Sequence, residues 1–321
     1  MARRLRGGLI AGGGALVAFV LAGHRSLPNW RGMGNTLDSA LPWIGFAVPL
    51  LALAALARWS RLALAGVVIP AVTWVMIFGP AFVRTAQTGP RDLRVVHQNV
   101  NFANGDLART ARALRATGAD ILVAAEVPDD PVLMNGTVHP AFAGPIDPGY
   151  RYRFPDNPGV AVWSRYPFEG RPRPVPGVER SRHAIIRTPR GEVSLYAVHL
   201  ASFRPDQPSV IAHRNAEVEA LARAVQADRS ARVIVVGDLN TAGTDRELGR
   251  LTETLSPVSE KAGTGLQFTW PAVLPVVRLD HVLTRGFTAV DSRVLPMTVS
   301  DHRAILADLR VSAAGGDSPN R

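Results

Sequence analysis

Long apolar segments occupy the first third of the chain, and short ones alternate with polar segments in the rest. Three uncharged apolar runs cover residues 7–23, 40–57 and 62–83. Because a helix rises 1.5 Å per residue, about 20 apolar residues cross the hydrocarbon core of a bilayer. Run 62–83 meets this length, run 40–57 is close to it, and run 7–23 is short and rich in glycine. The pattern predicts a helical transmembrane region over residues 1–90 with about three helices.

Two other interpretations of these runs stay open. Arginines precede run 7–23 and small residues end it near Ala22, which is also the pattern of a secretory signal peptide. Runs 40–57 and 62–83 could instead form a pair of buried helices in a soluble protein. Neither run has the polar stripe at helical spacing that a helix needs to face water, which argues against that interpretation.

The arginines beside the runs predict their orientation, because positive charges flanking transmembrane helices favour the cytoplasmic side. Those that place the N-terminus and the loop between the second and third runs in the cytoplasm are Arg3, Arg4, Arg6, Arg58 and Arg61. Those that oppose this orientation are Arg25, Arg31 and Arg84. With three crossings, the sequence predicts a multi-pass protein of the cell membrane whose residues after 84 lie outside the cytoplasm.

The net charge of +10 does not indicate a nucleic-acid-binding surface. Residues 1–90 hold eight Arg and one Asp, hence +7, whereas residues 91–310 hold 27 basic and 24 acidic side chains. The excess therefore lies beside the apolar runs, where it sets membrane topology. The chain has no cysteine, which excludes disulfides, thiolate metal sites and a cysteine nucleophile. With Lys261 as its one lysine and abundant Ala, Gly and Pro, the composition is typical of a GC-rich bacterial genome.

Residues 91–310 alternate strand-like runs with amphipathic segments, which predicts an α/β domain followed by a disordered tail over residues 311–321. The strand-like runs are residues 93–96, 121–125, 160–163, 184–186, 193–198, 233–236, 278–283, 287–294 and 304–309. Asp106 and Ser209 each precede apolar residues at helical spacing, so each is expected to cap a helix.

Polar side chains that could carry chemistry stand where these apolar runs end. In chain order they are Asn99, Glu126, His199, Asp238, Asn240, Asp280 and His302. Strand ends of α/β sheets are where side chains from distant parts of a sequence meet on one rigid edge. A protein with a purely structural role has no reason to place these residue types at successive strand ends.

Six short segments stand out, and five of them contain these residues. They are His97-Gln98-Asn99, Ala125-Glu126-Val127, residues 159–167 (GVAVWSRYP), Val198-His199-Leu200, residues 237–240 (GDLN), and Leu279-Asp280-His281 together with Ser300-Asp301-His302. In this order and spacing they resemble the endonuclease/exonuclease/phosphatase superfamily, over about residues 93–310. Each segment alone occurs by chance, but the ordered set is specific. The resemblance implies a four-layered α/β sandwich of the deoxyribonuclease I-like type and hydrolysis of phosphate esters.

Such hydrolysis needs neutralisation of the phosphate charge, activation of a water and stabilisation of the leaving oxygen. Glu126 is a hard oxygen ligand of the kind that Mg²⁺ prefers, and Mn²⁺ is an alternative ion. Asn99 is expected to add an amide oxygen, and Asp301 to support the metal site or His302. Without its context, Glu126 is equally well interpreted as a surface carboxylate at a strand end.

His302 is the expected general base, and Asp280 is expected to hold its ring in the right tautomer. The resemblance implies the same pairing. Asp238 is expected to orient the attacking water and Asn240 to donate to a phosphoryl oxygen, although Gly, Asp and Asn also favour a plain turn. His199 is expected to donate to the phosphoryl group as its charge grows, whereas His281 is interpreted as structural.

The predicted function is that of a membrane-anchored phosphodiesterase similar to a nuclease, acting as a monomer. One departure from the family's pattern argues against lesion-specific DNA cleavage as the activity. Apurinic exonuclease relatives carry a Tyr where this chain has Asn157, which is followed by Pro158. The alternative is a phospholipid or phosphoinositide phosphoesterase, which a membrane tether would hold beside its substrate. A domain used only for binding is disfavoured by the full set of catalytic positions. The substrate partner is therefore a phosphate ester, either a nucleic acid or a lipid headgroup.

Overall fold

The structure is a computed structural model that describes residues 2–58, 61–83, 87, 89–129, 137–154 and 159–312. The chain divides into two compact units. The helical unit comprises Met1–Val83 with Thr244–Arg246, and the sheet unit comprises Arg84–Gly243 with Glu247–Arg321. Asn157, Pro158 and most of the predicted tail 311–321 lie outside the described residues. The domain boundaries at residues 90 and 310 stay predictions.

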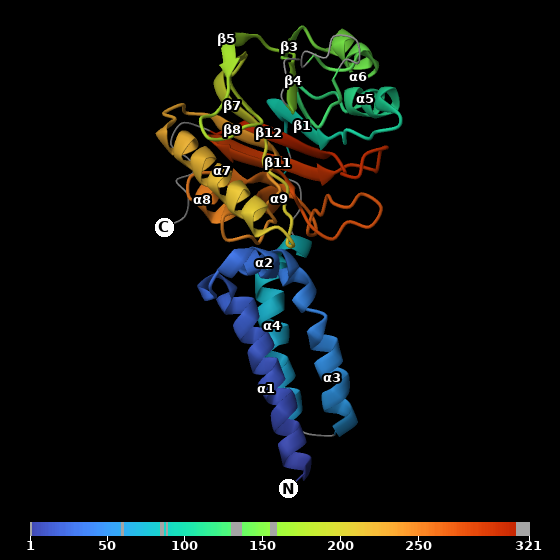
Figure 1. Cartoon of the computed structure of the whole chain (residues 1–321), viewed down its shortest axis with the longest axis vertical. Coiled ribbons are helices and arrows are strands. Elements are labelled where there is room, and N and C mark those ends of the chain that lie inside the picture. The colour runs from blue at the N-terminus through green and yellow to red at the C-terminus, as the bar shows by residue number, and fades with distance from the viewer. Residues whose placement is uncertain are drawn as a thin grey trace. The chain divides into compact units, whose positions relative to one another are not determined.

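The helical unit contains the helices α1 (Ala2–Gly23), α2 (Met33–Ile44), α3 (Ala47–Arg58) and α4 (Arg61–Val83). Helices α1 and α4 lie side by side (Figure 1). They meet at glycines: a Cβ atom added to Gly14 would lie 2.0 Å from the carbonyl oxygen of Gly66. Small residues let helix backbones approach closely, and such contacts are typical of transmembrane helices.

Within the described part of the chain, two helical segments are long and apolar enough to cross a membrane, Gly7–Ser26 and Arg61–Val83. There are three such spans if Trp30–Ile44 and Ala47–Ala57, which are bent by 55°, count as one. The predicted run 40–57 is thus not one straight helix. Pro49 cannot donate the backbone hydrogen bond of a continuing helix, and its place in the first turn of α3 favours a new helix there.

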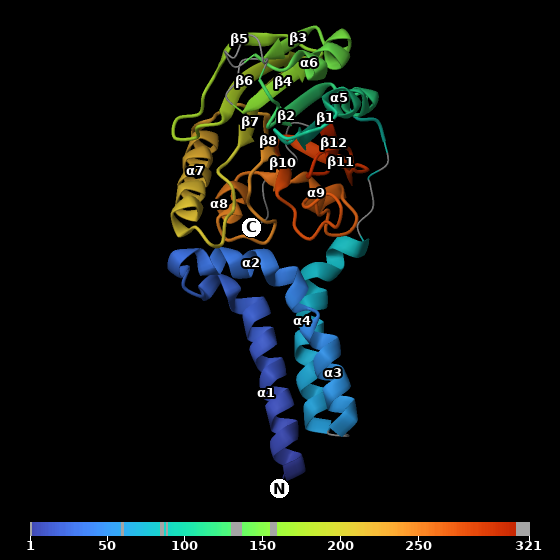
Figure 2. The same cartoon turned by 45° about the vertical axis from the view of Figure 1, so that its right-hand side comes forward.

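The sheet unit contains two six-stranded sheets (Figure 2). The first has the order β11 (Phe287–Val294), β12 (Ile305–Val311), β1 (Leu93–Asn99), β2 (Ile121–Ala125), β4 (Val160–Ser164) and β3 (Tyr152–Phe154). The second has the order β5 (Phe168–Arg173), β6 (Ser181–Thr188), β7 (Gly191–His199), β8 (Val233–Asp238), β10 (Asp280–Arg285) and β9 (Ser256–Pro257). Both are mixed, since β1 pairs with β2 and β7 with β8 in parallel, while the other pairs are antiparallel.

Helices cover the outer faces of both sheets. α5 (Leu107–Ala116) and α6 (Pro140–Ile146) pack on the first sheet, and α7 (Pro208–Ala227) and α8 (Leu248–Thr252) pack on the second. The short α9 (Val258–Ala262) contributes to the layer between the sheets. The predicted four-layered α/β sandwich is confirmed.

The largest core lies between the sheets, and strand alternation decides which residues enter it. In four of the strands these residues are Leu93 and Val95, Val193, Leu195 and Ala197, Ile234 and Val236, and Val282. Residues of the opposite parity, such as Val96 and Leu122, pack beneath α5 and α6 instead. The parity of each strand therefore decides which polar residues at its end reach the gap between the sheets.

Of the two helix caps predicted from the sequence, one is confirmed and one is wrong. Asp106 caps α5 as expected, with its Oδ1 accepting from the Arg109 backbone N–H at 2.9 Å. Ser209 does not cap α7, because Pro208 already occupies the first turn and Gln207 is the capping position. Proline has no N–H that needs a capping partner, so the helix begins one residue before the expected cap.

Candidate active site

The polar candidates continue the inward-facing alternation beyond the apolar core. Asn99 lies on the same face of its strand as Leu93 and Val95. In the same way, His199 follows Leu195 and Ala197, and Asp238 follows Ile234 and Val236. Asp280 opens the antiparallel strand β10, so it reaches the same end of the second sheet from the other direction. One face of each strand thus supplies the core along most of its length and polar groups at its end.

Strand pairing places three candidates next to one another. Asp238 is in register with His199 of the parallel strand β7 and with Asp280 of the antiparallel strand β10. Gly237 permits this close pairing, since an added Cβ atom would lie 1.8 Å from the carbonyl oxygen of Val198. Two carboxylates therefore stand directly opposite each other, and each is 1% exposed.

Asp280 accepts hydrogen bonds from two histidines. Its Oδ2 lies 2.8 Å from Nδ1 of His302, and its Oδ1 lies 3.0 Å from Nε2 of His97. Burial acts to raise the pKa of Asp280, but the charge of His302 and the hydrogen bonds from both rings outweigh it and hold the pKa well below its usual range. An ionised Asp280 requires both ring nitrogens to donate, which leaves Nε2 of His302 as the atom that can exchange a proton.

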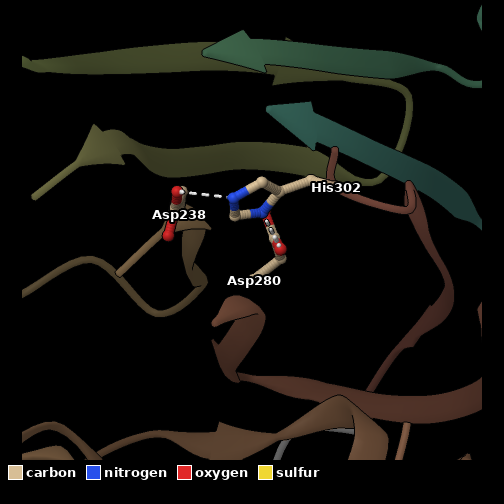
Figure 3. Close-up of side chains that lie close together, drawn as sticks. All are labelled: Asp238, Asp280 and His302. Carbon is tan, nitrogen blue, oxygen red and sulfur yellow. Dashed lines mark hydrogen bonds and ion pairs between the residues drawn. The ribbon is translucent and has the colours of Figure 1, made fainter. Parts of the chain in front are cut away.

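Nε2 of His302 faces the second carboxylate, at 3.8 Å from Oδ2 of Asp238 (Figure 3). Burial acts to lower the pKa of His302, but the charges of Asp280 and Asp238 outweigh it and raise the pKa to about 10. Burial raises the pKa of Asp238, and the charge of Asp280 adds to this effect. His302, Asp238 and Asp280 have ligand atoms that all lie within 4.8 Å of one another.

Glu126 joins this group from the first sheet. Its Oε1 accepts from Nδ2 of Asn99 at 3.0 Å and lies 3.3 Å from Nε2 of His199. The same Nδ2 donates to Oδ2 of Asp238 at 3.0 Å, so one amide bridges carboxylates of the two sheets. Burial opposes ionisation of Glu126, but the adjacent His199 ring and the hydrogen bond from Asn99 lower its pKa to about 2.

Glu126 and Asn240 both have left-handed backbone conformations, with φ of 52° and 45°. Such a conformation is uncommon for a side chain with a Cβ atom and is often found where function constrains the backbone. The Asn240 N–H donates to Oδ1 of Asp238 at 2.8 Å, and its Nδ2 donates to the carbonyl of Leu200 at 3.0 Å. The turn therefore fixes Asn240 beside Asp238 at the same edge.

Asp301 lies at the outer side of this group. It is exposed, its Oδ1 accepts from Nδ2 of Asn101 at 2.9 Å, and its Oδ2 accepts from Nε1 of Trp270 at 3.4 Å. It is near enough to His302 for its charge to help raise the pKa of that ring.

Residues 96–302, more than half of the chain, match the model of the Endonuclease/Exonuclease/phosphatase family. The chain belongs to this family. Members hydrolyse phosphate esters, and the chain is accordingly a phosphoesterase. No curated protein sequence matches it.

Solved structures share the fold at low sequence identity. Truncated TDP2 of Caenorhabditis elegans is 18% identical with a TM-score of 0.54, over 68% of this chain and 97% of the other. A family protein of Bacteroides thetaiotaomicron is 16% identical with a TM-score of 0.55, over 70% and 100%. A mannosyl-6-phosphatase of the same organism is 13% identical with a TM-score of 0.52, over 68% and 99%. The sandwich is thus of the predicted deoxyribonuclease I-like type.

Enzymes of this family generally use divalent metals, and the residues present fit such an ion. Glu126 and Asp238 are hard oxygen donors that share the Asn99 amide, and two carboxylates held together favour a cation between them. The Asn99 amide oxygen accepts from the Asn101 backbone N–H at 3.0 Å, while its nitrogen faces the carboxylates. The prediction that Asn99 is a metal ligand therefore requires its amide to turn over.

The sequence did not indicate two of the residues that hold the site together, His97 and Arg214. His97 lies in one of the six segments of the resemblance. Its position on the inward face of β1 was the signal that could have shown its contact with Asp280. His281, predicted to be structural, is buried and bonds the Thr241 carbonyl through Nε2 at 2.8 Å. Arg214 of α7 donates to the Thr241 hydroxyl at 2.8 Å, so the turn that carries Asn240 is braced from two sides.

The raised pKa of His302 predicts how the stability of the metal-free protein depends on pH. A group whose pKa is higher in the folded state than its usual value near 6.5 contributes stability that is complete below that value and is lost as pH rises towards 10. In chelator and detergent, the Tm should therefore fall between pH 7 and pH 10, by roughly 2–4 °C for each ~1 kcal/mol lost. The His302→Gln variant should show a smaller fall over the same interval. An equal fall in both proteins would contradict the assignment.

Proposed function

We propose that this protein is a membrane-anchored, divalent-metal-dependent phosphoesterase that hydrolyses phosphodiester bonds. The observation that carries the proposal is the buried Asp280–His302 pair, whose free ring nitrogen faces Asp238 while Glu126 and Asn99 approach from the other sheet. A base, its orienting carboxylate and an oxygen-rich cation site are what hydrolysis of a phosphate ester requires.

In the proposed reaction, Nε2 of His302 takes a proton from a water whose oxygen forms a bond to phosphorus. The bond between phosphorus and the leaving oxygen breaks, and that oxygen takes up a proton to become the product alcohol. Asp280 keeps the ring oriented throughout and stabilises the imidazolium that forms, in the way a carboxylate serves a histidine base in other hydrolases. Asp238 and Asn240 are suited to orient the water and a phosphoryl oxygen, and His199 to donate to the phosphoryl group.

The raised pKa of His302 gives a cation a second role in this proposal. With that pKa, His302 already holds a proton at neutral pH and cannot accept another. A bound divalent ion neutralises carboxylate charge, polarises the phosphate and lowers the pKa of a nearby base. The negative charges that hold the proton on His302 include Asp238, which also lies beside Glu126 and Asn99.

Membrane anchoring is supported by the two apolar helices that are long enough to span a bilayer and by the bent pair between them. The arginine distribution favours a cytoplasmic N-terminus. With the bent pair as a second crossing, the sheet unit would lie outside the cytoplasm.

Activity is expected to require a hard divalent cation, because the carboxylates of Glu126 and Asp238 are hard oxygen donors and the chain has no thiolate. EDTA should abolish hydrolysis of a chromogenic phosphodiester by the full-length protein in detergent. Mg²⁺ or Mn²⁺ should then restore it. Full activity after exhaustive chelation would exclude the metal site.

The Asp280–His302 pair is expected to act as one unit in catalysis. His302→Gln and Asp280→Asn should each lower kcat by about 10²–10⁴-fold with little change in KM, since both act mainly at the transition state. The double variant should lose little more than the worse single variant. His213→Gln, the same change at an exposed position of α7, is the matched control and should retain activity. Losses that multiply in the double variant would refute the pairing.

The topology is expected to place the C-terminus outside the cytoplasm. A reporter active only outside, fused to the C-terminus of the full chain, should work, and one active only in the cytoplasm should be silent. The opposite result would mean an even number of crossings and a catalytic unit that faces cytoplasmic substrates. Fusions after Ser26 and after Ala57 check each crossing separately.

A further inference from the structure

The helical unit contains three residues from the second half of the chain, Thr244–Arg246. They follow closely on the turn that carries Asp238 and Asn240, since only residues 241–243 separate Asn240 from Thr244. The chain returns to the sheet unit at Glu247. A segment next in sequence to the candidate active site is therefore part of the unit that the N-terminal helices form.

Arg246 holds the side chain of Asp38 in α2 through a fork of hydrogen bonds. Its Nε donates to Oδ2 of Asp38 at 2.8 Å, and its Nη2 donates to Oδ1 at 3.1 Å. The backbone N–H of Arg246 also donates to Oδ2, at 2.9 Å. We call the contact of Arg246 with Asp38 the clamp. Asp38 is 0% exposed, and a buried carboxylate that is held on both oxygens fixes the orientation of its partner.

The surroundings of the clamp fit the guanidinium closely. Its Nη1 donates to the Leu27 carbonyl at 2.6 Å, and its Nη2 donates to the His24 carbonyl at 2.8 Å. Gly34 lets the guanidinium approach α2, because an added Cβ atom there would lie 2.5 Å from Cζ of Arg246. A lysine has neither the planar fork nor enough donors for these partners. The helical unit is therefore shaped for an arginine and not for a positive charge alone.

The two residues before Arg246 are bound to α2 as well. The Thr244 hydroxyl donates to the Asp38 carbonyl at 2.5 Å, and Nδ2 of Asn35 donates to Oδ1 of Asp245 at 2.9 Å. Asn35 and Asp245 are both buried. A membrane anchor requires only apolar helices and a linker, whereas a buried polar network specifies one arrangement of the chain. The helical unit therefore fixes where residues 244–246 lie on α2.

The position of residues 244–246 bears on Asn240 because the connection between them is short. The chain from Asn240 to Thr244 spans at most roughly 14 Å, so a shift of Thr244 reaches Asn240. Asn240 has a left-handed backbone with φ of 45°, a conformation that persists only where the surrounding structure determines it. Strand β8 holds this turn on its upstream side, and the clamp holds the chain on its downstream side.

We propose that Asp38 and Arg246 are positioning residues of the phosphoesterase. By holding residues 244–246, the clamp keeps Asn240 where it can donate to a phosphoryl oxygen. Asp38 and Arg246 act through Asn240 and not on the substrate. This inference rests on the proposed function and extends it, because it gives the helical unit a part in catalysis besides anchoring.

The test uses the full-length protein in detergent with Mg²⁺ and a water-soluble chromogenic phosphodiester. It compares kcat and KM per folded molecule, with folded protein quantified by size-exclusion chromatography. Arg246→Met removes the fork and keeps the apolar stem, Asp38→Asn changes the other half of the clamp, and Arg246→Lys is the milder change. Arg246→Met is also made in an Asn240→Ala background. The matched control is Arg250→Met, the same change at an exposed arginine of α8 that pairs with Glu247.

Arg246→Met and Asp38→Asn should each lower kcat about 10–10²-fold with a smaller change in KM, because misplacing a catalytic group by about 1 Å has an effect of this size. In the Asn240→Ala background, Arg246→Met should change kcat by less than about twofold, since residues that act through one another are not additive. Arg250→Met should keep the kcat of wild type.

Wild-type kcat in folded Arg246→Met or Asp38→Asn would overturn the inference and leave the proposed function standing. An equal fractional loss in the Asn240→Ala background, which is the result of a role in folding alone, would overturn it too. If Arg246→Met does not fold, Arg246→Lys decides by the same two comparisons, since it keeps the charge and loses the fork. A wild type that hydrolyses no phosphate ester would remove the proposed function, and this inference with it.

Discussion

The candidate site depends on the buried carboxylate of Asp280. An ionised carboxylate in the interior loses its hydration, which costs several kcal/mol unless protein groups replace the water. His302 and His97 do so from two sides, one on each oxygen. Because both oxygens are occupied, the carboxylate has no freedom to turn, and the His302 ring is held with Nε2 towards Asp238. The orientation of the base thus follows from how Asp280 is neutralised.

The sandwich makes this arrangement tolerable because polar residues such as His199 and Asp238 continue an apolar inner face of their strands. Leu195 precedes His199, and Ile234 precedes Asp238, on the same side of their strands. Well-packed strands fix the position of their end residues, so the cost of burying charge and of the left-handed backbone at Glu126 is offset by the core behind them. Most of the site lies at strand ends, which are more precise supports for functional side chains than loops are, and His302 is held in its loop by Asp280.

Residue patterns in the sequence predicted nine strands and the polar positions at their ends, because alternation and strand ends are local properties, but they missed β3, β5 and β9. The four-layered arrangement was predicted from the family resemblance that the ordered motifs carry. Features that depend on distant partners were missed, as at His97, which is 183 residues from the carboxylate that it contacts. Helix α6, with Pro140 and Pro145, lacks the periodicity of a long helix and was not expected. The break between α2 and α3 was hidden because an apolar run does not show where its helix bends.

The charge of this edge affects how a phosphate ester can bind. Glu126, Asp280 and Asp301 bring negative charge to this edge, and the protonated ring of His302 offsets part of it. An acidic edge repels a phosphate, so a cation has to supply attraction for the substrate as well as chemistry.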